Sequence, residues 1–216
     1  SNQSAHFLDS AGRSYSVPAN TLPSARGQGE PLTGKLTLPP GASIEQVLMA
    51  ADNQRLLLAS DAGYGFICTF ADLVARNRVG KTVLTLPDNA RVLPPLELQR
   101  DDDLLLTVTA AGRMLLFPVS DLPELSKGKG NKIVSIPAAH LASGDDRILW
   151  LMAIAPQSTI TLHAGKRKYS LRPEELQKYQ ASRGCKGTQL PRGLQRVDRI
   201  EVDAPAGIAS AGSSEE

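Results

Sequence analysis

Glycine-containing loops that carry several lysines or arginines recur along the chain, and this combination suits the binding of phosphate groups. The densest of them, residues 126–133 (SKGKGNKI), holds three lysines and two glycines. Glycine lets a backbone come close to a ligand and present its N–H groups, while cationic side chains attract phosphate oxygens. Taken alone, such a loop fits a nucleotide site, a nucleic-acid contact or a solvated surface.

Three further loops have the same chemistry: residues 24–35 (SARGQGEPLTGK), 75–81 (ARNRVGK) and 182–187 (SRGCKG). None of the four contains the GxxxxGK[ST] pattern of a nucleotide P-loop, and each precedes an expected strand rather than a helix. One basic loop is more often a solvated surface, but four in corresponding places favour a common anionic partner. The cations assigned to this surface, from these loops and from the last repeat, are Arg26, Lys35, Arg76, Arg78, Lys81, Lys127, Lys129, Lys132, Lys166, Arg167, Lys168, Arg183, Lys186 and Arg192.

Positive charge is concentrated toward the end of the chain. Residues 157–200 hold ten basic and three acidic residues, a net charge of +7, whereas the whole chain carries only +2. Acidic residues gather elsewhere, as in RDDDL at residues 100–104. Duplex DNA carries one negative charge per roughly 1.7 Å of its axis. A series of spaced basic loops therefore matches duplex DNA.

The elements that must position these loops repeat with a period of about fifty residues. Four hairpin-like segments each consist of an apolar run, a small-residue turn that ends in glycine, and a second run. The turn glycines are 51, 49 and 53 residues apart, and a tight hairpin turn often needs the positive φ that glycine adopts readily. The segments are residues 5–17, 55–70, 104–119 and 158–171, with turn glycines Gly12, Gly63, Gly112 and Gly165.

A second phrase follows each hairpin in the same order along the chain. It is a short alternating run that ends at proline, which predicts a half-buried strand that stops there because proline lacks an N–H donor. A further apolar run follows each phrase and predicts a fourth strand. The phrases are KLTLP, VLTLP, IVSIP and GTQLP, which end at Pro39, Pro87, Pro137 and Pro191.

Four short strands per repeat indicate an all-β, propeller-like array of about four blades. The predicted domain covers residues 1–204, with repeat units at roughly 5–52, 53–101, 102–156 and 157–204. One helix is expected at residues 172–179 (RPEELQKY), where proline leads a run of helix formers. Residues 205–216 read as a flexible tail.

Composition excludes several classes of protein. The two cysteines, Cys68 and Cys185, form no CxxC or CxxH spacing, which argues against a structural zinc site and favours a reduced, cytosolic setting. No apolar run approaches the roughly 18 residues of a membrane-spanning helix. The first ten residues lack the pattern of a signal peptide. We therefore expect no membrane association.

Four longer phrases resemble a known family, the C-terminal domain of the A subunit of bacterial DNA topoisomerase IV. They are residues 22–42 (LPSARGQGEPLTGKLTLPPGA), 60–81 (SDAGYGFICTFADLVARNRVGK), 111–133 (AGRMLLFPVSDLPELSKGKGNKI) and 165–177 (GKRKYSLRPEELQ), and the likeness extends over residues 7–203. The resemblance implies a β-pinwheel, a propeller-like array of four-stranded blades. It also implies that a basic outer rim binds and bends duplex DNA, which helps to present the transported segment for decatenation and relaxation of supercoils.

The family's domain usually has more than four blades, so the resemblance implies an N-terminally shortened five-blade domain. The related gyrase domain carries a QRRGGKG-type box, which this chain lacks; SKGKGNK, SARGQG and SRGCKG are degenerate counterparts. This departure fits topoisomerase IV and argues against gyrase-like supercoiling. Implied partners are duplex DNA, the B subunit, the rest of the A subunit, and a chromosome-organising condensin, in the bacterial cytoplasm at the nucleoid.

No catalytic activity is expected of this chain alone. The resemblance assigns the catalytic tyrosine, ATP and magnesium to other parts of the holoenzyme, so this domain needs no cofactor. The four tyrosines and Trp150 read as packing or surface residues, the scattered His6, His140 and His163 fit no nucleophilic arrangement, and Asp101–Asp103 (DDD) reads as a solvated loop.

Two other functions remain open from the sequence. A propeller of this kind can serve as a protein–protein interaction module, whose DNA affinity would be weak even at low salt. A propeller-type hydrolase is poorly supported, because the repeats place no carboxylates in register.

Overall fold

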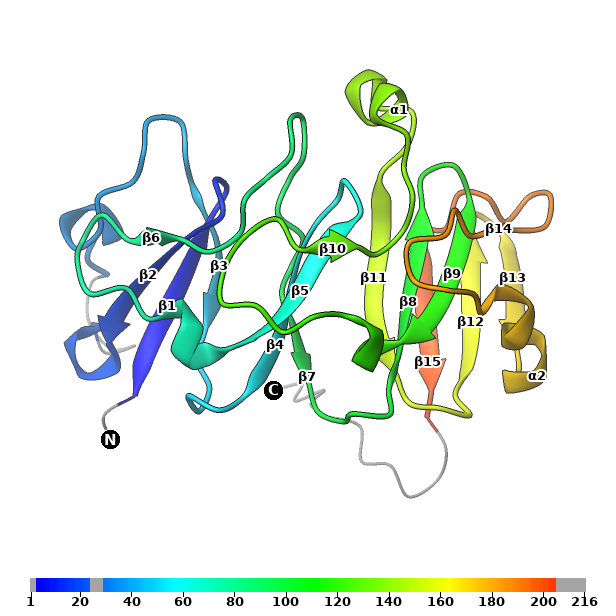
Figure 1. Ribbon diagram of the computed structural model, residues 1–216, viewed down its shortest axis with the longest axis horizontal. Coiled ribbons are helices and arrows are strands. Elements are labelled where there is room, and N and C mark those ends of the chain that lie inside the picture. The colour runs from blue at the N-terminus through cyan, green and yellow to red at the C-terminus, as the bar shows by residue number, and fades with distance from the viewer. Residues whose placement is uncertain (1–2, 24–28, 205–216) are drawn as a thin grey trace. The chain divides into compact units, whose positions relative to one another are not determined.

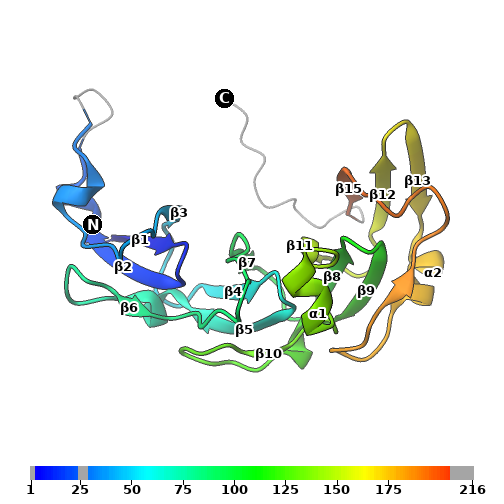
Figure 2. The same cartoon turned by 90° about the horizontal axis from the view of Figure 1, so that it is seen from above.

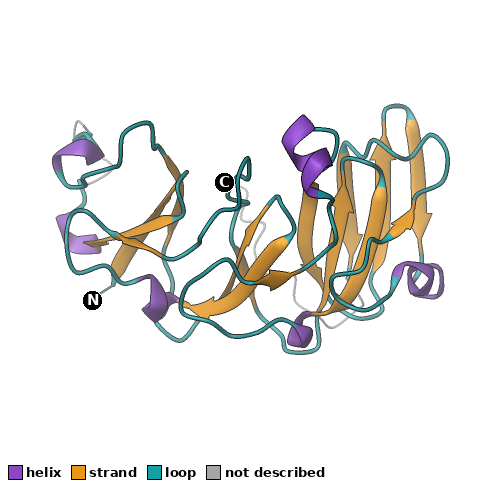
Figure 3. Cartoon of the chain, turned by 45° about the horizontal axis from the view of Figure 1, so that its top comes forward, coloured by secondary structure: helices purple, strands orange, loops and turns teal. Residues whose placement is uncertain are grey.

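Most of the regular secondary structure consists of short strands, as expected from the alternating apolar runs (Figure 3). The structure is a computed structural model that describes residues 3–23 and 29–204. The predicted cation Arg26 and the predicted tail at residues 205–216 lie outside the described residues. The strands form four sheets, which confirms the all-β prediction.

The four predicted hairpins are all present (Figure 1). Their turn glycines have φ of 80°, 91°, 77° and 57° in chain order, so each adopts the left-handed backbone that glycine favours. The pairs are β1 (Ser4–Asp9) with β2 (Arg13–Pro18), β4 (Arg55–Ser60) with β5 (Tyr64–Thr69), β8 (Leu104–Thr109) with β9 (Arg113–Pro118), and β12 (Thr159–Ala164) with β13 (Arg167–Leu171).

The chain divides into two compact units, each made of three segments. The first unit contains Ser1–Ser60, Gly65–Glu97 and Glu124–Gly130, and the second contains Asp61–Tyr64, Leu98–Pro123 and Asn131–Glu216. The four predicted repeats divide the chain at other residues than these two units do. Their boundaries stay a prediction.

The first unit holds two sheets. In one of them the strands lie in the order β3-β1-β2-β6, where β3 is Ile44–Leu48 and β6 is Lys81–Thr82. In the other, β5, β4 and β7 (Leu96–Leu98) are neighbours in that order. Apolar side chains from both hairpins are buried here, among them Phe7 and Tyr15 in one cluster and Leu56 and Phe66 in the other.

The second unit also holds two sheets. One has the order β11-β8-β9-β14, with β11 at Ile148–Ile154 and β14 at Thr188–Gln189. The other has the order β13-β12-β15, with β15 at Arg199–Asp203 (Figure 2). The two-residue strand β10 is Asn131–Lys132. Leucine and isoleucine side chains of β8, β9, β12 and β13 share one buried cluster.

Two short helices complete the second unit. The predicted one is α2 (Pro173–Leu176), which continues as a 3-10 turn over Gln177–Tyr179. Its first turn is closed by the backbone N–H of Arg172, which donates to Oε2 of Glu175 at 2.9 Å. The other, α1 (Ala138–Ser143), was not predicted; it begins after Pro137 and ends at Gly144 with φ of 79°.

The prediction of proline-ended strands was wrong for most of their length. The strands β6, β10 and β14 are only two residues long, and none of them reaches the proline that ends its phrase. The N–H group of the third residue of three phrases donates to a carbonyl of the next basic loop: Thr37 to Arg78 (2.8 Å), Thr85 to Gly128 (2.9 Å) and Ser135 to Cys185 (2.9 Å). These donors are therefore used by a loop and not by a sheet ladder.

Each short strand was expected in the same sheet as the hairpin of its own repeat, and the observed pairing is different. Strand β6 pairs with β2, and β14 pairs with β9, so the chain of one repeat supplies the outer strand to the hairpin of the repeat before it. This exchange places the basic loop that leads into each of these strands directly beside a preceding hairpin.

Candidate nucleic-acid interface

The basic loops at residues 75–81, 126–132 and 182–188 are each pinned to a hairpin strand by a glycine. Gly80, Gly130 and Gly187 have φ of 63°, 81° and 81°. A Cβ at these positions would lie 2.5 Å from the Ser14 carbonyl oxygen, 2.2 Å from that of Gly65 and 2.9 Å from that of Met114, in that order. Only glycine allows this close approach, so the loop backbone has a fixed position at this residue.

A second contact fixes each loop three residues further on. The carbonyl of the hairpin glycine accepts a hydrogen bond from the first buried apolar residue after the short strand. The three bonds are Val83 to Gly12 (3.0 Å), Ile133 to Gly63 (2.7 Å) and Leu190 to Gly112 (2.8 Å). In all three loops, basic side chains therefore lie within a few residues of a two-point backbone anchor.

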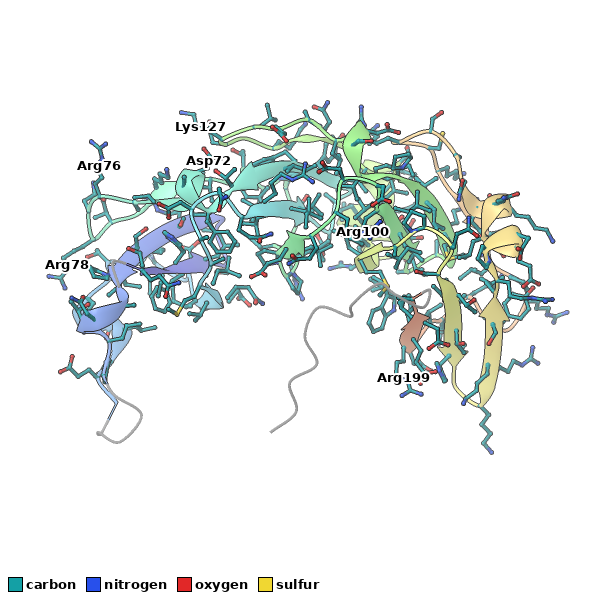
Figure 4. The ribbon with its side chains drawn as sticks, turned by 90° about the horizontal axis from the view of Figure 1, so that it is seen from below. Asp72, Arg76, Arg78, Arg100, Lys127 and Arg199 are labelled. Atoms are coloured by element: carbon teal, nitrogen blue, oxygen red, sulfur yellow. The ribbon has the colours of Figure 1, made fainter. Side chains whose placement is uncertain are left out.

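Several cations of the first unit extend into solvent. Arg76, Arg78, Lys127 and Lys129 are exposed, and Figure 4 shows the first three extending outward from the ribbon. Lys81 is half-buried. These side chains lie on segments that are linked through backbone contacts, because Thr85 N–H donates to the carbonyl of Gly128.

Lys35 is less available than predicted. Its side chain is 27% exposed, its ammonium group donates to the carbonyl of Thr21, and it lies 3.6 Å from the Glu30 carboxylate. A phosphate would have to compete with both partners.

In the second unit the predicted cations fall into two groups. Lys132 and Lys186 are exposed on the basic loops, and Lys132 lies 6.0 Å above the centre of the Tyr64 ring. Exposed cations also surround the turn between β12 and β13, where the Arg167 guanidinium donates to the carbonyl of Arg192 at 3.1 Å. This second group consists of Lys166, Arg167, Lys168 and Arg192.

Two predicted arginines direct their guanidinium groups at backbone carbonyls. Arg78 donates to the carbonyls of Gly34 and Lys35. Arg183 donates to Asp121 at 2.9 Å and to Lys132 at 2.6 Å. These bonds join one basic loop to another segment of the same unit, so the two arginines have a structural task besides any contact with a ligand.

Two arginines that the sequence reasoning missed have the same kind of contact. Arg13 and Arg113 follow the turn glycines of their hairpins and donate to carbonyls of the basic loops. The signal was present as the repeated triplet AGR at residues 11–13 and 111–113. It was overlooked because these arginines lie in hairpins and not in glycine-rich loops.

Two of the residues considered for catalysis, Tyr15 and Trp150, have packing roles. Tyr15 is fully buried and donates to Oδ2 of Asp9 at 2.7 Å, and burial together with this carboxylate raises the pKa of Tyr15 to about 12. The indole N–H of Trp150 donates to the carbonyl of Val197 at 2.9 Å, beside the core of the second unit. Neither side chain is placed for nucleophilic or base-stacking chemistry.

Ion pairs account for the other charged clusters. In RDDDL, Arg100 bonds Asp102 through two hydrogen bonds of 2.8 and 2.7 Å, and this arginine lowers the pKa of the Asp102 carboxyl. On β15, Glu201 lies 3.0 Å from His163 and 2.9 Å from Arg199, and the hydrogen bond from His163 lowers the pKa of Glu201. No group of three or more His, Cys, Asp or Glu side chains that could hold a metal ion occurs within residues 3–23 and 29–204.

Comparison with known proteins decides the family. The family model described as the DNA gyrase C-terminal domain, a beta-propeller, matches residues 10–50, 54–94 and 103–155, which is more than half of the chain. The chain belongs to the DNA gyrase C-terminal domain family. This assignment confirms the resemblance drawn from the repeated phrases.

Relatives with high identity to this chain come from topoisomerase IV. The chain is 64% identical over 216 residues to the A subunit of DNA topoisomerase 4 from Salmonella typhimurium and 63% identical to that from Escherichia coli, and the match covers the whole chain. The chain spans 28% of the length of these relatives. A solved structure of the E. coli ParC C-terminal domain matches with a TM-score of 0.91 and 63% identity, covering 95% of this chain and 83% of that one.

These matches confirm a β-pinwheel built from four sheets in this chain. In the described part of the chain, no helix combines the length and apolar character that a membrane crossing requires.

Proposed function

We propose that this chain is the DNA-binding and DNA-bending domain of the A subunit of a bacterial topoisomerase IV. It engages duplex DNA through its basic loops, on the outer rim that the resemblance implies, and so helps to present the transported segment for decatenation and relaxation of supercoils. The 64% identity to the A subunit of DNA topoisomerase 4 and the family of DNA gyrase C-terminal domains support this role.

One observation supports DNA as the ligand more than any other. Lys129 and Lys186 are exposed at the same place in two different loops, each directly before the glycine that pins its loop to a hairpin. A fixed backbone with an exposed lysine is suited to a phosphate contact, because little freedom is lost when the contact forms. Phosphate contacts carry no base information, so binding should depend weakly on sequence.

Bending requires several such contacts acting together. Bending a site of 20–30 base pairs costs about 1–6 kcal/mol by smooth elastic estimates. No single exposed cation offsets that cost, but cations on successive loops can share it. The repeated loop geometry within each unit supplies such a series.

The remaining parts of the proposal rest on the family resemblance. This domain is non-catalytic, and the catalytic tyrosine, ATP and magnesium belong to the rest of the holoenzyme. Its protein partners are the B subunit, the remainder of the A subunit, and a chromosome-organising condensin, in the bacterial cytoplasm at the nucleoid. The match to 28% of the relatives' length accords with a part of a larger polypeptide.

The direct test is a titration of the 216-residue chain against two duplexes of equal length and unrelated sequence. We expect equal affinities that fall steeply between about 50 and 200 mM salt, because bound phosphates release counterions. Energy transfer between dyes at the two duplex ends should increase on binding if the DNA bends. Absence of binding at the lowest salt would instead favour the protein-docking alternative.

A further inference from the structure

The residue that follows the turn glycine of a hairpin contacts the basic loop of the next repeat. In the first unit this residue is Arg13. Its Nη2 donates to the carbonyls of Val79 at 2.6 Å and Gly80 at 3.0 Å, and its Nε donates to Val79 at 3.2 Å. Its Nη1 also donates to Oγ1 of Thr82 at 3.2 Å. One guanidinium therefore binds both sides of the glycine that pins the loop.

Arg113 has the same position and the same contact in the second unit. Its Nη1 donates to the carbonyl of Gly187 at 3.1 Å, and Gly187 corresponds to Gly80 in its loop. The side chain of Gln189 completes the attachment by donating to the carbonyls of Ala111 and Gly112, both at 3.0 Å. The same device thus occurs independently in each unit.

The β4–β5 hairpin uses different chemistry at the same place. Tyr64 follows the turn glycine Gly63, and the Lys132 ammonium group lies 6.0 Å over its ring. Lys132 corresponds to Thr82, because each is the second residue of a two-residue strand. The position after the turn glycine is therefore a contact point for the following basic loop in all three of these hairpins.

The two arginines are half-buried, which separates them from the exposed lysines of the loops. A guanidinium that forks onto carbonyl oxygens uses its donors inside the protein and neutralises the negative ends of dipoles that would repel phosphate. The lysines directly before the pinning glycines, Lys129 and Lys186, are exposed to solvent. Positive charge is thus used for two different tasks at one place in the repeat.

We propose that Arg13 and Arg113 are positioning residues, which hold the basic loops in the conformation that binds DNA phosphates and make no phosphate contact themselves. This inference rests on the proposed DNA-binding function and assigns roles within the same surface. The phosphate ligands beside them are the exposed lysines of the loops.

Charge-preserving substitutions test this assignment. Arg13→Lys and Arg113→Lys keep the positive charge but lose the planar guanidinium, which reaches two loop carbonyls in Arg13 and one in Arg113. We expect duplex affinity of the 216-residue chain to fall about threefold to tenfold, since an unanchored loop must be ordered on binding. The slope of log affinity against log salt should stay unchanged, because no phosphate contact is lost. The matched control is Arg172→Lys, an exposed arginine outside the basic loops, which should bind like the parent.

A second readout needs no DNA. Trypsin should cleave the loop at residues 75–81 faster in Arg13→Lys than in the parent, because that loop contains Arg76, Arg78 and Lys81 as cleavage sites. Circular dichroism checks that each variant folds, and Arg113→Lys lies in the other unit and provides an independent variant.

Two results would overturn the assignment. One is that Arg13→Lys and Arg113→Lys both bind DNA as tightly as the parent, while Arg13→Gln lowers the slope of log affinity against log salt by about 0.9. That decrease would mark a direct phosphate contact of Arg13. The other is an unchanged rate of cleavage in the loop. If the parent chain fails to bind DNA, the proposed function fails, while the cleavage rates still decide whether Arg13 anchors the loop.

Discussion

At the scale of single residues, the two cysteines have opposite environments. Cys68 on β5 is only 3% exposed, and burial, followed by the nearby charge of Asp72, raises the pKa of its thiol to about 12. Cys185 is exposed in the basic loop at residues 182–187. The thiolate is the reactive form, so the two side chains should differ in reactivity by far more than their sequence contexts suggest.

This contrast predicts that one thiol per chain reacts quickly with Ellman's reagent in the native state at about pH 8. Cys185→Ser should remove the fast reaction, and Cys68 should react only after denaturant unfolds the first unit. Cys68→Ser is the matched control and should leave the fast reaction in place. Two fast thiols in the native parent would show that the β4–β5 region opens readily.

The groups that each lysine or arginine contacts cannot be read from the sequence. The sequence singled out the basic loops by their glycines and cations. It could not separate Arg78 and Arg183, which donate to carbonyls of other segments, from Lys127 and Lys186, which are exposed on their loops. That difference depends on which carbonyls of distant segments come within reach after folding, and whether each cation binds DNA stays a prediction.

At the scale of elements, two glycines of the first unit with positive φ differ in what surrounds them. Gly12, in the β1–β2 turn, has φ of 80°, and a Cβ there would lie 2.0 Å from the carbonyl oxygen of Leu84. Gly41 in the same unit has φ of 78°, but a Cβ at that residue would have nothing within 4 Å. The pair therefore separates the cost of the backbone conformation from the cost of close packing.

We expect Gly41→Ala to destabilise the chain by about 1–2 kcal/mol, the cost of a left-handed backbone for a residue with a Cβ. Gly12→Ala should cost roughly 1–3 kcal/mol more, because the segment after β6 must also move away from the turn. Urea unfolding followed by circular dichroism measures both changes. Equal midpoints for the two variants would mean that the contact between Gly12 and Leu84 contributes nothing.

The elements also show where sequence reasoning succeeds. The hairpins were predictable because alternation and a turn glycine are local signals, and all four glycines have positive φ. The proline-ended phrases were misread because their alternation reflects burial of residues such as Val83 and Ile133 and not membership of a ladder. Their hydrogen-bond partners lie in the hairpin before them and in the basic loop after them, which no local pattern reveals. Helix α1 was missed because its six residues are too short to show a helical period.

At the scale of the whole molecule, the net charge conceals how charge is distributed. The chain carries +2, yet residues 157–200 alone carry +7, and acidic residues such as Asp102 are paired with arginine. Attraction of a polyanion depends on local clusters of cations within about one Debye length, roughly 8–10 Å. A weakly basic chain can therefore bind DNA strongly at low salt and lose affinity steeply as salt is added.

The number of phosphates contacted by one loop can be measured from this salt dependence. Lys127 and Lys129 are both exposed on the loop at residues 126–132, and replacing both by alanine should flatten the slope of log affinity against log salt by up to about 1.8, or 0.9 per lost contact. Lys178→Ala, an exposed lysine outside the basic loops, removes one charge and should leave the slope unchanged. An unaltered slope in the double variant would remove this loop from the DNA-binding surface. A decrease in slope half as large in Lys178→Ala would instead indicate that binding follows total charge and not the placement of these lysines.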